Sequence, residues 1–298
     1  MWNRYRKEKF PGKFTSRKKY NHLRDKYELL AASIASPENP FQRKAKIKCV
    51  IPFHQKSKHS EVCFFVSYSP KPQIKPHVRH HIEALLASGL EVVLVINSDE
   101  YDTDLHTEQA ESLGLSGLYI RENIGFDFSA WSHLFALTKH QIGSDRIYLV
   151  NDSVIGPLSQ DMLVSLLRSV RESSSALIGL TQNAQPRYHV QSYFLVLNTP
   201  LLRSELFSQY FENIWALPTK EMVIDTYETN LTQAVMRMGF DVAALFPQVG
   251  DAGDKTDNVL HHVDALVDRG FPYVKTSVSS TPAAQKVLRK WLPKLAAS

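Results

Sequence analysis

Residues 61–100 read EVCFFVSYSPKPQIKPHVRHHIEALLASGLEVVLVINSDE, and this stretch decides the fold class. Near its two ends, 62–66 and 92–96 are continuous apolar runs of strand length. Between them, apolar residues recur at helical three-and-four spacing until Gly89, a typical helix stop. Strands that are apolar throughout are typical of a parallel sheet whose two faces are both covered by helices. The stretch therefore predicts a strand, a helix and a second strand within an α/β fold.

The same two patterns continue along the chain. Further strands are predicted at 118–123, 146–152, 176–182 and 189–198, and further helices at 159–170, 200–214, 225–239 and 258–270. Ser159 is predicted to cap the first of these helices. The whole reads as an open, mostly parallel sheet with helices on both faces.

Composition narrows the class of protein. A chain of 298 residues with 43% hydrophobic residues can bury a full core. Cys49 and Cys63 belong to no Cys-x-x-Cys or Cys/His cluster, so neither a disulfide framework nor a structural zinc site is expected. The apolar runs fall far short of the roughly 20 residues of a membrane span, and the N-terminus has no apolar signal region. These features favour a protein of the reducing cytoplasm.

The positive charge is concentrated at the N-terminus. Residues 1–48 hold 14 Lys and Arg against 4 Asp and Glu, a balance of +10, whereas 49–298 hold 21 against 26, a balance of −5. Residues 1–47 are predicted to form a basic amphipathic tail and linker before an α/β domain at 48–298. Two interpretations stay open: a solvated helix packed on the body, or docking of residues 1–45 on an anionic membrane surface. Nucleic-acid binding is disfavoured, because no recognised motif accompanies the tail and the body is acidic.

Polar residues gather where the predicted strands end, at 97–99, 123–127 and 151–153. Ligands of open α/β sheets bind outside the carboxyl ends of the strands, so we expect these residues to share one edge. The chain has no P-loop, no G-x-G-x-x-G after the first strand and no G-x-S-x-G, which disfavours dinucleotide dehydrogenases and α/β-hydrolases. A site built from carboxylates, amides and helix N-termini remains.

The stretch 121–135, RENIGFDFSAWSHLF, joins a strand end to a helix. Gly125 lets the backbone approach a ligand closely, Asp127 is predicted to cap the helix, and the N–H groups at its start suit an anion. An Asn-Gly turn followed by a simple helix cap explains the same residues. Asp152 in YLVNDSVIGPL is either a hard oxygen ligand for a divalent cation or an ordinary turn residue.

Five blocks, in this order and spacing, resemble the rhamnan synthesis F proteins, bacterial glycosyltransferases of polysaccharide assembly. The blocks are RENIGFDFSAW, YLVNDSVIGPL, GLTQNAQPRYHVQSYFLVLN, YETNLTQAVMRMGF and GFPYVK, and the resemblance spans residues 60–276, without the tail. It implies a glycosyltransferase-A-like open sheet and a nucleotide-sugar donor, with dTDP-rhamnose as the suggested one. It also implies a growing O-antigen, capsule, lipopolysaccharide or cell-wall glycan on a lipid carrier as acceptor.

The resemblance further implies where the donor binds. The implied residues are Ser67, Tyr68, Asn97, Asp99, Arg121, Asn123, Gly125, Asp127, Asn151 and Asp152. Residues 151–153 stand where such folds often carry an Asp-x-Asp metal motif, but only one carboxylate is present. Asp152 can hold Mg²⁺ or Mn²⁺ through the donor diphosphate and water, and dependence on a metal stays open. Without a metal, Arg121, Arg187 or Lys275 would neutralise the leaving diphosphate.

Inverting sugar transfer needs a base beside the acceptor hydroxyl. Glu228 is the first candidate and Asp225 the second, because their place resembles the late acidic helix start of many inverting enzymes of this fold; acids that satisfy a helix dipole are the alternative. On the strand from residue 189, His189 and Gln191 share one face and are predicted to contact the sugar or acceptor, unless they are ordinary strand residues. Arg187 and Lys275 complete the predicted substrate contacts.

The function predicted from the sequence is therefore transfer of a sugar from a nucleotide-sugar to a hydroxyl of a cell-surface polysaccharide or lipid-linked oligosaccharide. The expected place is the cytoplasm, peripheral on the inner face of the cytoplasmic membrane. The alternative is a non-catalytic carbohydrate or nucleotide-sugar binding module within a polysaccharide assembly complex.

Overall fold

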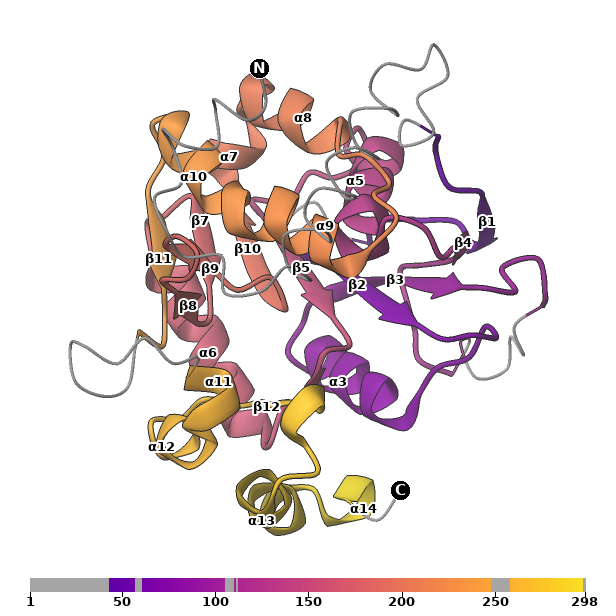
Figure 1. Cartoon of the computed structure of the whole chain (residues 1–298). Helices are drawn as coiled ribbons and strands as arrows, with labels where there is room; N and C mark the ends of the chain where they lie inside the picture. The colour runs from indigo at the N-terminus through magenta and orange to yellow at the C-terminus, as the bar shows by residue number, and fades with distance from the viewer. Residues whose placement is uncertain (1–42, 57–60, 105–109, 111, 248–257, 297–298) are drawn as a thin grey trace, which may run out of the picture. The chain divides into compact units, whose positions relative to one another are not determined.

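The computed structural model describes residues 43–56, 61–104, 110, 112–247 and 258–296 (Figure 1). Lys44–Ser298 form one compact unit. Residues 1–42 of the predicted tail lie outside the described residues, so the tail, its membrane docking and the division at 47/48 stay predictions. Within the described part of the chain, no helix combines the length and the hydrophobicity that crossing a bilayer requires.

An eight-stranded sheet forms the centre of this unit, in the order β1-β4-β3-β2-β5-β10-β7-β11. Its strands are β1 (Ile47–Ile51), β2 (Val62–Tyr68), β3 (Glu91–Ser98), β4 (Gly117–Glu122), β5 (Arg146–Asn151), β7 (Leu177–Gly179), β10 (Phe194–Asn198) and β11 (Val242–Ala244). Strands β4, β3, β2 and β5 run parallel, as do β7 and β11, whereas β1 and β10 are antiparallel to their neighbours. Two short pairs lie beside this sheet: β6 (Val154–Ile155) with β12 (Val274–Lys275), and β8 (Gln182–Asn183) with β9 (His189–Val190).

Helices cover both faces of the sheet, as Figure 1 shows for α3 and α6 on one side and α5 on the other. The helical segments are α3 (Pro76–Ala87), α5 (Phe126–Thr138), α6 (Gln160–Glu172), α7 (Thr199–Leu202), α8 (Glu205–Glu212), α9 (Lys220–Val223), η2 (Ile224–Glu228), α10 (Thr229–Arg237), α11 (Asn258–His261), α12 (Val263–Asp268), η3 (Thr276–Val278), α13 (Pro282–Trp291) and α14 (Pro293–Ala296). Side chains of α3 and α6 share one apolar cluster with Phe65 and Leu94. Trp131 of α5 donates from Nε1 to the carbonyl of Phe64, 3.1 Å away. The fold class predicted from the sequence, an open and mostly parallel α/β sheet, is confirmed.

Several predicted elements are interrupted. The helix predicted at 200–214 divides at Ser204, whose hydroxyl accepts from Phe207 N (3.2 Å) and so caps a new helix. The helix predicted at 258–270 divides at His262. The strand predicted at 189–198 divides into β9 and β10, because Gln191 N turns to the carbonyl of Thr181 (2.9 Å). The Ser159 cap is confirmed, since its hydroxyl accepts from Met162 N at 3.2 Å.

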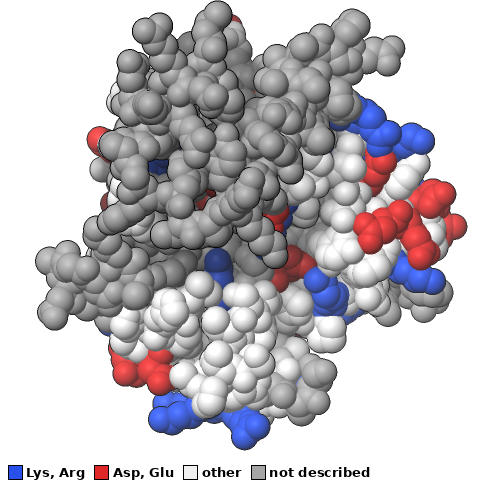
Figure 2. Space-filling view, viewed as in Figure 1, with Lys and Arg blue, Asp and Glu red and all other residues white. Residues whose placement is uncertain are grey.

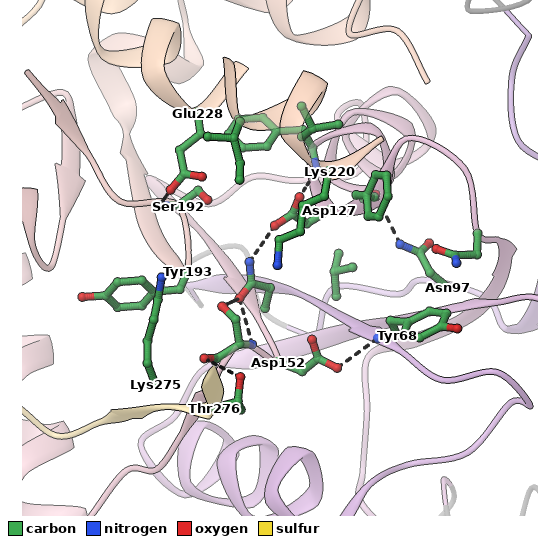
Figure 3. A pocket seen from close by; sticks show the side chains of 18 of the residues that line it. Tyr68, Asn97, Asp127, Asp152, Ser192, Tyr193, Lys220, Glu228, Lys275 and Thr276 are labelled. Atoms are coloured by element: carbon green, nitrogen blue, oxygen red, sulfur yellow. Dashed lines mark hydrogen bonds between the residues drawn. The ribbon is translucent and has the colours of Figure 1, made fainter. Parts of the chain in front are cut away.

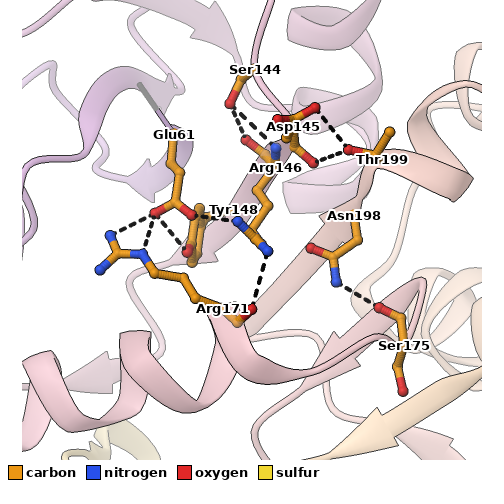
Figure 4. A network of polar contacts seen from close by, with 9 residues as sticks. All are labelled: Glu61, Ser144, Asp145, Arg146, Tyr148, Arg171, Ser175, Asn198 and Thr199. Atoms are coloured by element: carbon orange, nitrogen blue, oxygen red, sulfur yellow. Dashed lines mark hydrogen bonds and ion pairs between the residues drawn. The ribbon is translucent and has the colours of Figure 1, made fainter. Parts of the chain in front are cut away.

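A charged network holds the amino end of the sheet, opposite the polar strand ends (Figure 4). Glu61 accepts from Arg146 (3.1 Å), from Arg171 (2.7 Å) and from the Tyr148 hydroxyl (3.1 Å). Because Arg146 and Tyr148 belong to β5 and Arg171 to α6, the network joins β5 and α6 to the chain entering β2. Its partners are all within the network or the adjacent backbone, which indicates a structural role.

Candidate active site

A pocket of about 770 Å³ opens at the carboxyl ends of β2, β3 and β5 (Figure 3). Eight of the residues predicted from the sequence line it: Tyr68, Asn97, Asn123, Asp127, Asn151, Asp152, Glu228 and Lys275. The other eight lie outside the lining: Ser67, Asp99, Arg121, Gly125, Arg187, His189, Gln191 and Asp225. On the face seen in Figure 2, acidic and basic atoms lie close together near the middle of the molecule. The polar strand ends therefore do meet at one edge, as the sequence predicts.

The loop between β4 and α5 is built around Arg121, whose side chain is fully buried. Its guanidinium donates to Asn97 (3.2 Å), to the Ser129 hydroxyl (2.8 Å) and to the carbonyls of Glu122 (3.1 Å) and Ile124 (2.8 Å). Burial lowers the pKa of Arg121 to about 10. The expectation that Arg121 faces the donor diphosphate is wrong for this arrangement, because the guanidinium points inward and holds the loop.

Gly125 and Phe126 begin α5 in an unusual backbone conformation. Gly125 has φ 70° and Phe126 has φ 54°, both in the left-handed region that residues other than glycine rarely adopt. Gly125, not Asp127, is the cap residue; Asp127 stands in the first turn and its Oδ1 accepts from Phe128 N at 3.0 Å. The predicted Asp127 cap is therefore wrong by two positions. Strain of this kind collects at functional sites, and Asp127, the next residue after Phe126, lines the pocket.

Asp127 and Glu228 form a pair of carboxylates in the pocket (Figure 3). Asn151 Nδ2 donates to Asp127 Oδ2 at 2.7 Å. Burial, and then the charge of Glu228, raise the pKa of Asp127 from 3.8 to about 6 against the effect of these hydrogen bonds. A carboxyl group with such a pKa can exchange a proton near neutral pH.

We expect Asp127→Asn to change how stability depends on pH. The folded-state pKa of Asp127 is above its ordinary value, so its contribution to stability is full below pH 4 and is lost as the pH rises through 6. The unfolding free energy of the variant, relative to the native chain, should therefore increase by about 2 kcal/mol between pH 4 and pH 8. Urea unfolding at intervals across this range measures it. A difference that stays constant with pH would show that Asp127 has an ordinary pKa.

Glu228 reaches the pocket from an unexpected kind of helix. A continuous helical segment starts at Lys220, capped by the Thr219 hydroxyl, which accepts from Met222 N at 3.2 Å. The five residues of η2 are a π-helix that ends at Glu228, and π-helical turns are common at functional sites. Glu228 Oε1 accepts from Ser192 N at 3.1 Å. Because the segment begins eight residues earlier, the explanation of Glu228 as a first-turn acid that satisfies the helix dipole is wrong.

Asp152 is held by groups of the protein itself. Its Oδ2 accepts from the Ser67 hydroxyl (2.9 Å), from Tyr68 N (3.0 Å) and from the Lys75 ammonium (2.5 Å). Its carbonyl lies 3.3 Å from Nε2 of His77. The carboxylate is thus already paired with a cation.

These surroundings do not fit a divalent cation at Oδ2 of Asp152. A metal ion on Oδ2 would have to displace the Lys75 ammonium, and among the described residues no group of three or more His, Cys, Asp or Glu could ligate one. Mg²⁺ and Mn²⁺ prefer several oxygen ligands, and two like charges at one oxygen repel each other. At this oxygen the Lys75 ammonium occupies the place that a metal ion would take.

The remaining predicted residues support the pocket or lie away from it. Asp99 accepts from the Tyr68 hydroxyl (2.7 Å) and from Asn123 Nδ2 (2.9 Å), and so ties three strand ends together. Gln191 accepts from the Thr181 hydroxyl at 2.6 Å, and Nδ1 of buried His189 lies 2.8 Å from the carbonyl of Arg187. The expectation that His189 and Gln191 point together into the pocket is therefore wrong.

Two further predicted residues lie on the protein surface. Arg187 donates to Asn230 at 2.7 Å, outside the pocket lining. Asp225 is exposed, and its carbonyl accepts from Thr229 and Asn230. Neither residue lines the pocket, so the predicted roles of both residues stay predictions.

The sequence interpretation missed several pocket residues. Lys75, His77, Lys220 and Tyr193 line the pocket beside the predicted residues. Lys75 directly precedes Pro76, the first residue of α3, so a basic residue at a strand-to-helix connection was the available signal. Nothing in the sequence around Lys220 distinguishes it from a surface lysine.

Fold and site together define an α/β protein with a charged pocket at the carboxyl ends of its parallel strands. The chain belongs to the rhamnan synthesis protein F family, whose model matches residues 92–296.

Two curated relatives are similar to part of the chain. An uncharacterised protein of Sinorhizobium fredii, y4gN, is 31% identical over 172 residues, which cover 55% of this chain and 43% of the relative. The virulence protein VirA of Vibrio anguillarum is 27% identical over 163 residues, 53% of this chain and 49% of the relative. The chain thus spans about half the length of the curated relatives it matches.

Among solved structures, the glycosyltransferase GlyE of Streptococcus pneumoniae is similar at 12% identity. The similarity covers 80% of this chain and 64% of that one, with a TM-score of 0.38. A TM-score below 0.5 does not establish a common fold.

Proposed function

We propose that the chain is a glycosyltransferase that moves a sugar from a nucleotide-sugar donor to a hydroxyl group of a growing cell-surface polysaccharide or lipid-linked oligosaccharide. Membership of a family named for rhamnan synthesis supports polysaccharide synthesis and makes dTDP-rhamnose the first candidate donor. The observation that carries the proposal is the pocket in which Asp127 and Glu228 face charged and amide side chains at the strand ends.

The proposed mechanism is an inverting displacement. Glu228 takes the proton of the acceptor hydroxyl, whose oxygen attacks the anomeric carbon from the face opposite the phosphate. The bond between the anomeric carbon and the phosphate oxygen breaks, and the nucleoside diphosphate leaves with its electron pair. The hydrogen bond from Ser192 N orients the Glu228 carboxylate for this role.

The ends of β2, β3 and β4 form the part of the pocket that is proposed to bind the nucleoside. Tyr68 offers an exposed ring and Asn123 an amide group, while the buried Asn97, which donates to the carbonyl of Phe126 and accepts from Arg121, supports this wall of the pocket. An aromatic face with a few placed polar groups is typical of sites that bind a base and a ribose. The sugar would then lie toward Asp127 and Glu228.

We further propose that the protein works in the cytoplasm, on the inner face of the membrane where lipid-linked acceptors lie. The charge of +10 in residues 1–48 supports this, because each Lys or Arg near an anionic surface contributes about 1 kcal/mol.

Binding of one nucleoside diphosphate should be visible as a rise in melting temperature. We expect one of dTDP, UDP, GDP and CDP to stabilise the full chain selectively, and a ligand at a hundred times its dissociation constant adds about 2.7 kcal/mol. That corresponds to a shift of roughly 5 °C for a domain of this size. Sugar transfer from the matching nucleotide-sugar then tests turnover. If the nucleotide binds but no sugar is transferred or hydrolysed, the chain is a binding module of an assembly complex and the proposal of an enzyme is wrong.

A further inference from the structure

We infer that Lys75 and Lys275 neutralise the diphosphate of the donor in place of a divalent cation, and that Asp152 positions Lys75. This inference rests on the proposed function, since it assigns the counter-charge of the same pocket. In this inference Asp152, the single carboxylate after β5, positions a lysine and does not bind a metal ion.

Asp152 holds the Lys75 ammonium through one of its carboxylate oxygens. Its Oδ2 receives a hydroxyl, a backbone N–H and an ammonium group, all within 3.0 Å. Both charges of the Lys75–Asp152 pair are largely shielded, with 31% and 18% of their side chains exposed. A carboxylate surrounded in this way fixes the ammonium at the pocket wall, where Lys75 is part of the lining.

Lys275 belongs to β12, the strand that pairs with the chain segment after Asp152. Strand β12 pairs with β6, which begins two residues after Asp152, and Lys275 stands opposite Val154. Thr276 N donates to the carbonyl of Ser153 at 2.9 Å, and its hydroxyl donates to the same carbonyl at 3.1 Å. The backbones that carry Asp152 and Lys275 are therefore locked together.

The ammonium of Lys275 is available for an anion. Nζ lies 5.6 Å from the centroid of the Tyr193 ring, a cation–π contact that holds the side chain over the pocket, as Figure 3 shows. Among the described residues, Lys275 forms no ion pair with a carboxylate. Lys275 and the Asp152-bound Lys75 both line the pocket, and two cations suit an anion with two charged groups, such as a diphosphate.

The chemistry needs this counter-charge at the moment of bond breaking. The leaving nucleoside diphosphate gains negative charge as the bond to the anomeric carbon breaks, and fixed cations stabilise that charge without reorganising. Lys220 also lines the pocket, but it lies at the start of α9 on the side of Asp127 and Glu228, where the sugar and the acceptor hydroxyl are proposed to lie.

Calorimetric titration of the full chain with dTDP, UDP, GDP and CDP, in EDTA and in Mn²⁺, tests the inference. We expect the nucleotide that binds to do so with the same affinity in both buffers. We expect Lys275→Met and Lys75→Met each to weaken it by about tenfold or more, since a hydrogen bond to a charged group is lost. Lys286→Met, an exposed lysine of α13 outside the pocket lining, is the matched control and should bind as the native chain does.

A double-mutant cycle tests the positioning role of Asp152. If Asp152 acts through Lys75, Asp152→Asn should weaken binding in the native background but have no further effect in Lys75→Met. Additive losses would overturn the positioning role. Should Lys75→Met fail to fold, as its melting curve would reveal, Lys275→Met alone still tests the counter-charge.

The titrations distinguish a failure of this inference from a failure of the proposed function. Nucleotide binding that requires Mn²⁺, and that is lost in Asp152→Asn, would overturn the inference while the proposed function stands. Binding that is independent of Mn²⁺ but unaffected by either lysine variant would overturn it as well. If none of the four nucleotides binds in either buffer, both the inference and the proposed function fall.

Discussion

Replacing Glu228 with Gln is expected to lower kcat for sugar transfer by about 10³-fold, within the range that a positioned general base contributes. Gln keeps the size of the side chain and an oxygen that can accept from Ser192 N, so the hydrogen bond at 3.1 Å can persist. The change removes the group that takes the proton and little else. Nucleotide affinity should therefore stay close to that of the native chain.

The measurement is initial-rate kinetics with the nucleotide-sugar that the melting experiment selects, together with nucleotide affinity by calorimetry. Glu221→Gln is the matched control, because Glu221 is an exposed glutamate of α9 outside the pocket lining and undergoes the same chemical change. A kcat within a few-fold of the native value would remove Glu228 as the base. A large loss in Asp225→Asn instead would return the role to Asp225, against its exposed position.

The centre of the fold could be predicted from residues 61–100, because burial on both faces leaves a continuous apolar pattern that local reading detects. The polar ends of β3, β4 and β5 could be predicted for a related reason: the apolar run stops where the strand leaves the core. The resemblance to a family supplied the order of the blocks and the candidate base Glu228. These inferences use patterns of near neighbours in the sequence.

The contacts that place the charged side chains in the pocket join residues far apart in the chain. Lys75 and Asp152 are 77 residues apart, and Lys275 reaches the same place through the pairing of β12 with β6. No local pattern in the sequence predicts that residues so far apart come into contact. The inward turn of Arg121 was missed for another reason: an arginine at the polar end of a strand suggests a ligand contact, and only the structure shows the carbonyls to which it donates.

The π-helix at η2 and the bend at Gln191 illustrate a third limit. A helical pattern predicts that residues 225–239 are helical but gives no sign of where the hydrogen bonds widen by one residue. The alternation around His189 predicts a strand, yet the hydrogen bond of Gln191 N to Thr181 ends that strand after two residues. In both places tertiary contacts override the local preference.

Gly125→Ala is expected to destabilise the fold by about 3 kcal/mol or more, through two effects that add at this position. The backbone at Gly125 has φ 70°, which strains any residue with a Cβ atom. A Cβ atom here would also lie 2.5 Å from Cβ of Ser129 and 2.6 Å from the backbone Cα of Ala216. Neither neighbour is the end of a flexible side chain, so the loop itself would have to shift.

That shift should also reduce nucleotide binding, because the same loop carries Asn123 and Asp127 into the pocket. Gly239→Ala separates the two causes: Gly239 has φ 88°, but a Cβ atom there would meet nothing within 4 Å. Strain alone should cost Gly239→Ala about 1 kcal/mol and leave nucleotide affinity unchanged. Urea unfolding and calorimetry of both variants make the comparison. Equal unfolding free energies for the two variants would mean that the close packing of Gly125 against Ser129 and Ala216 does not constrain the loop, and the argument that this glycine holds Asp127 in the pocket would fail.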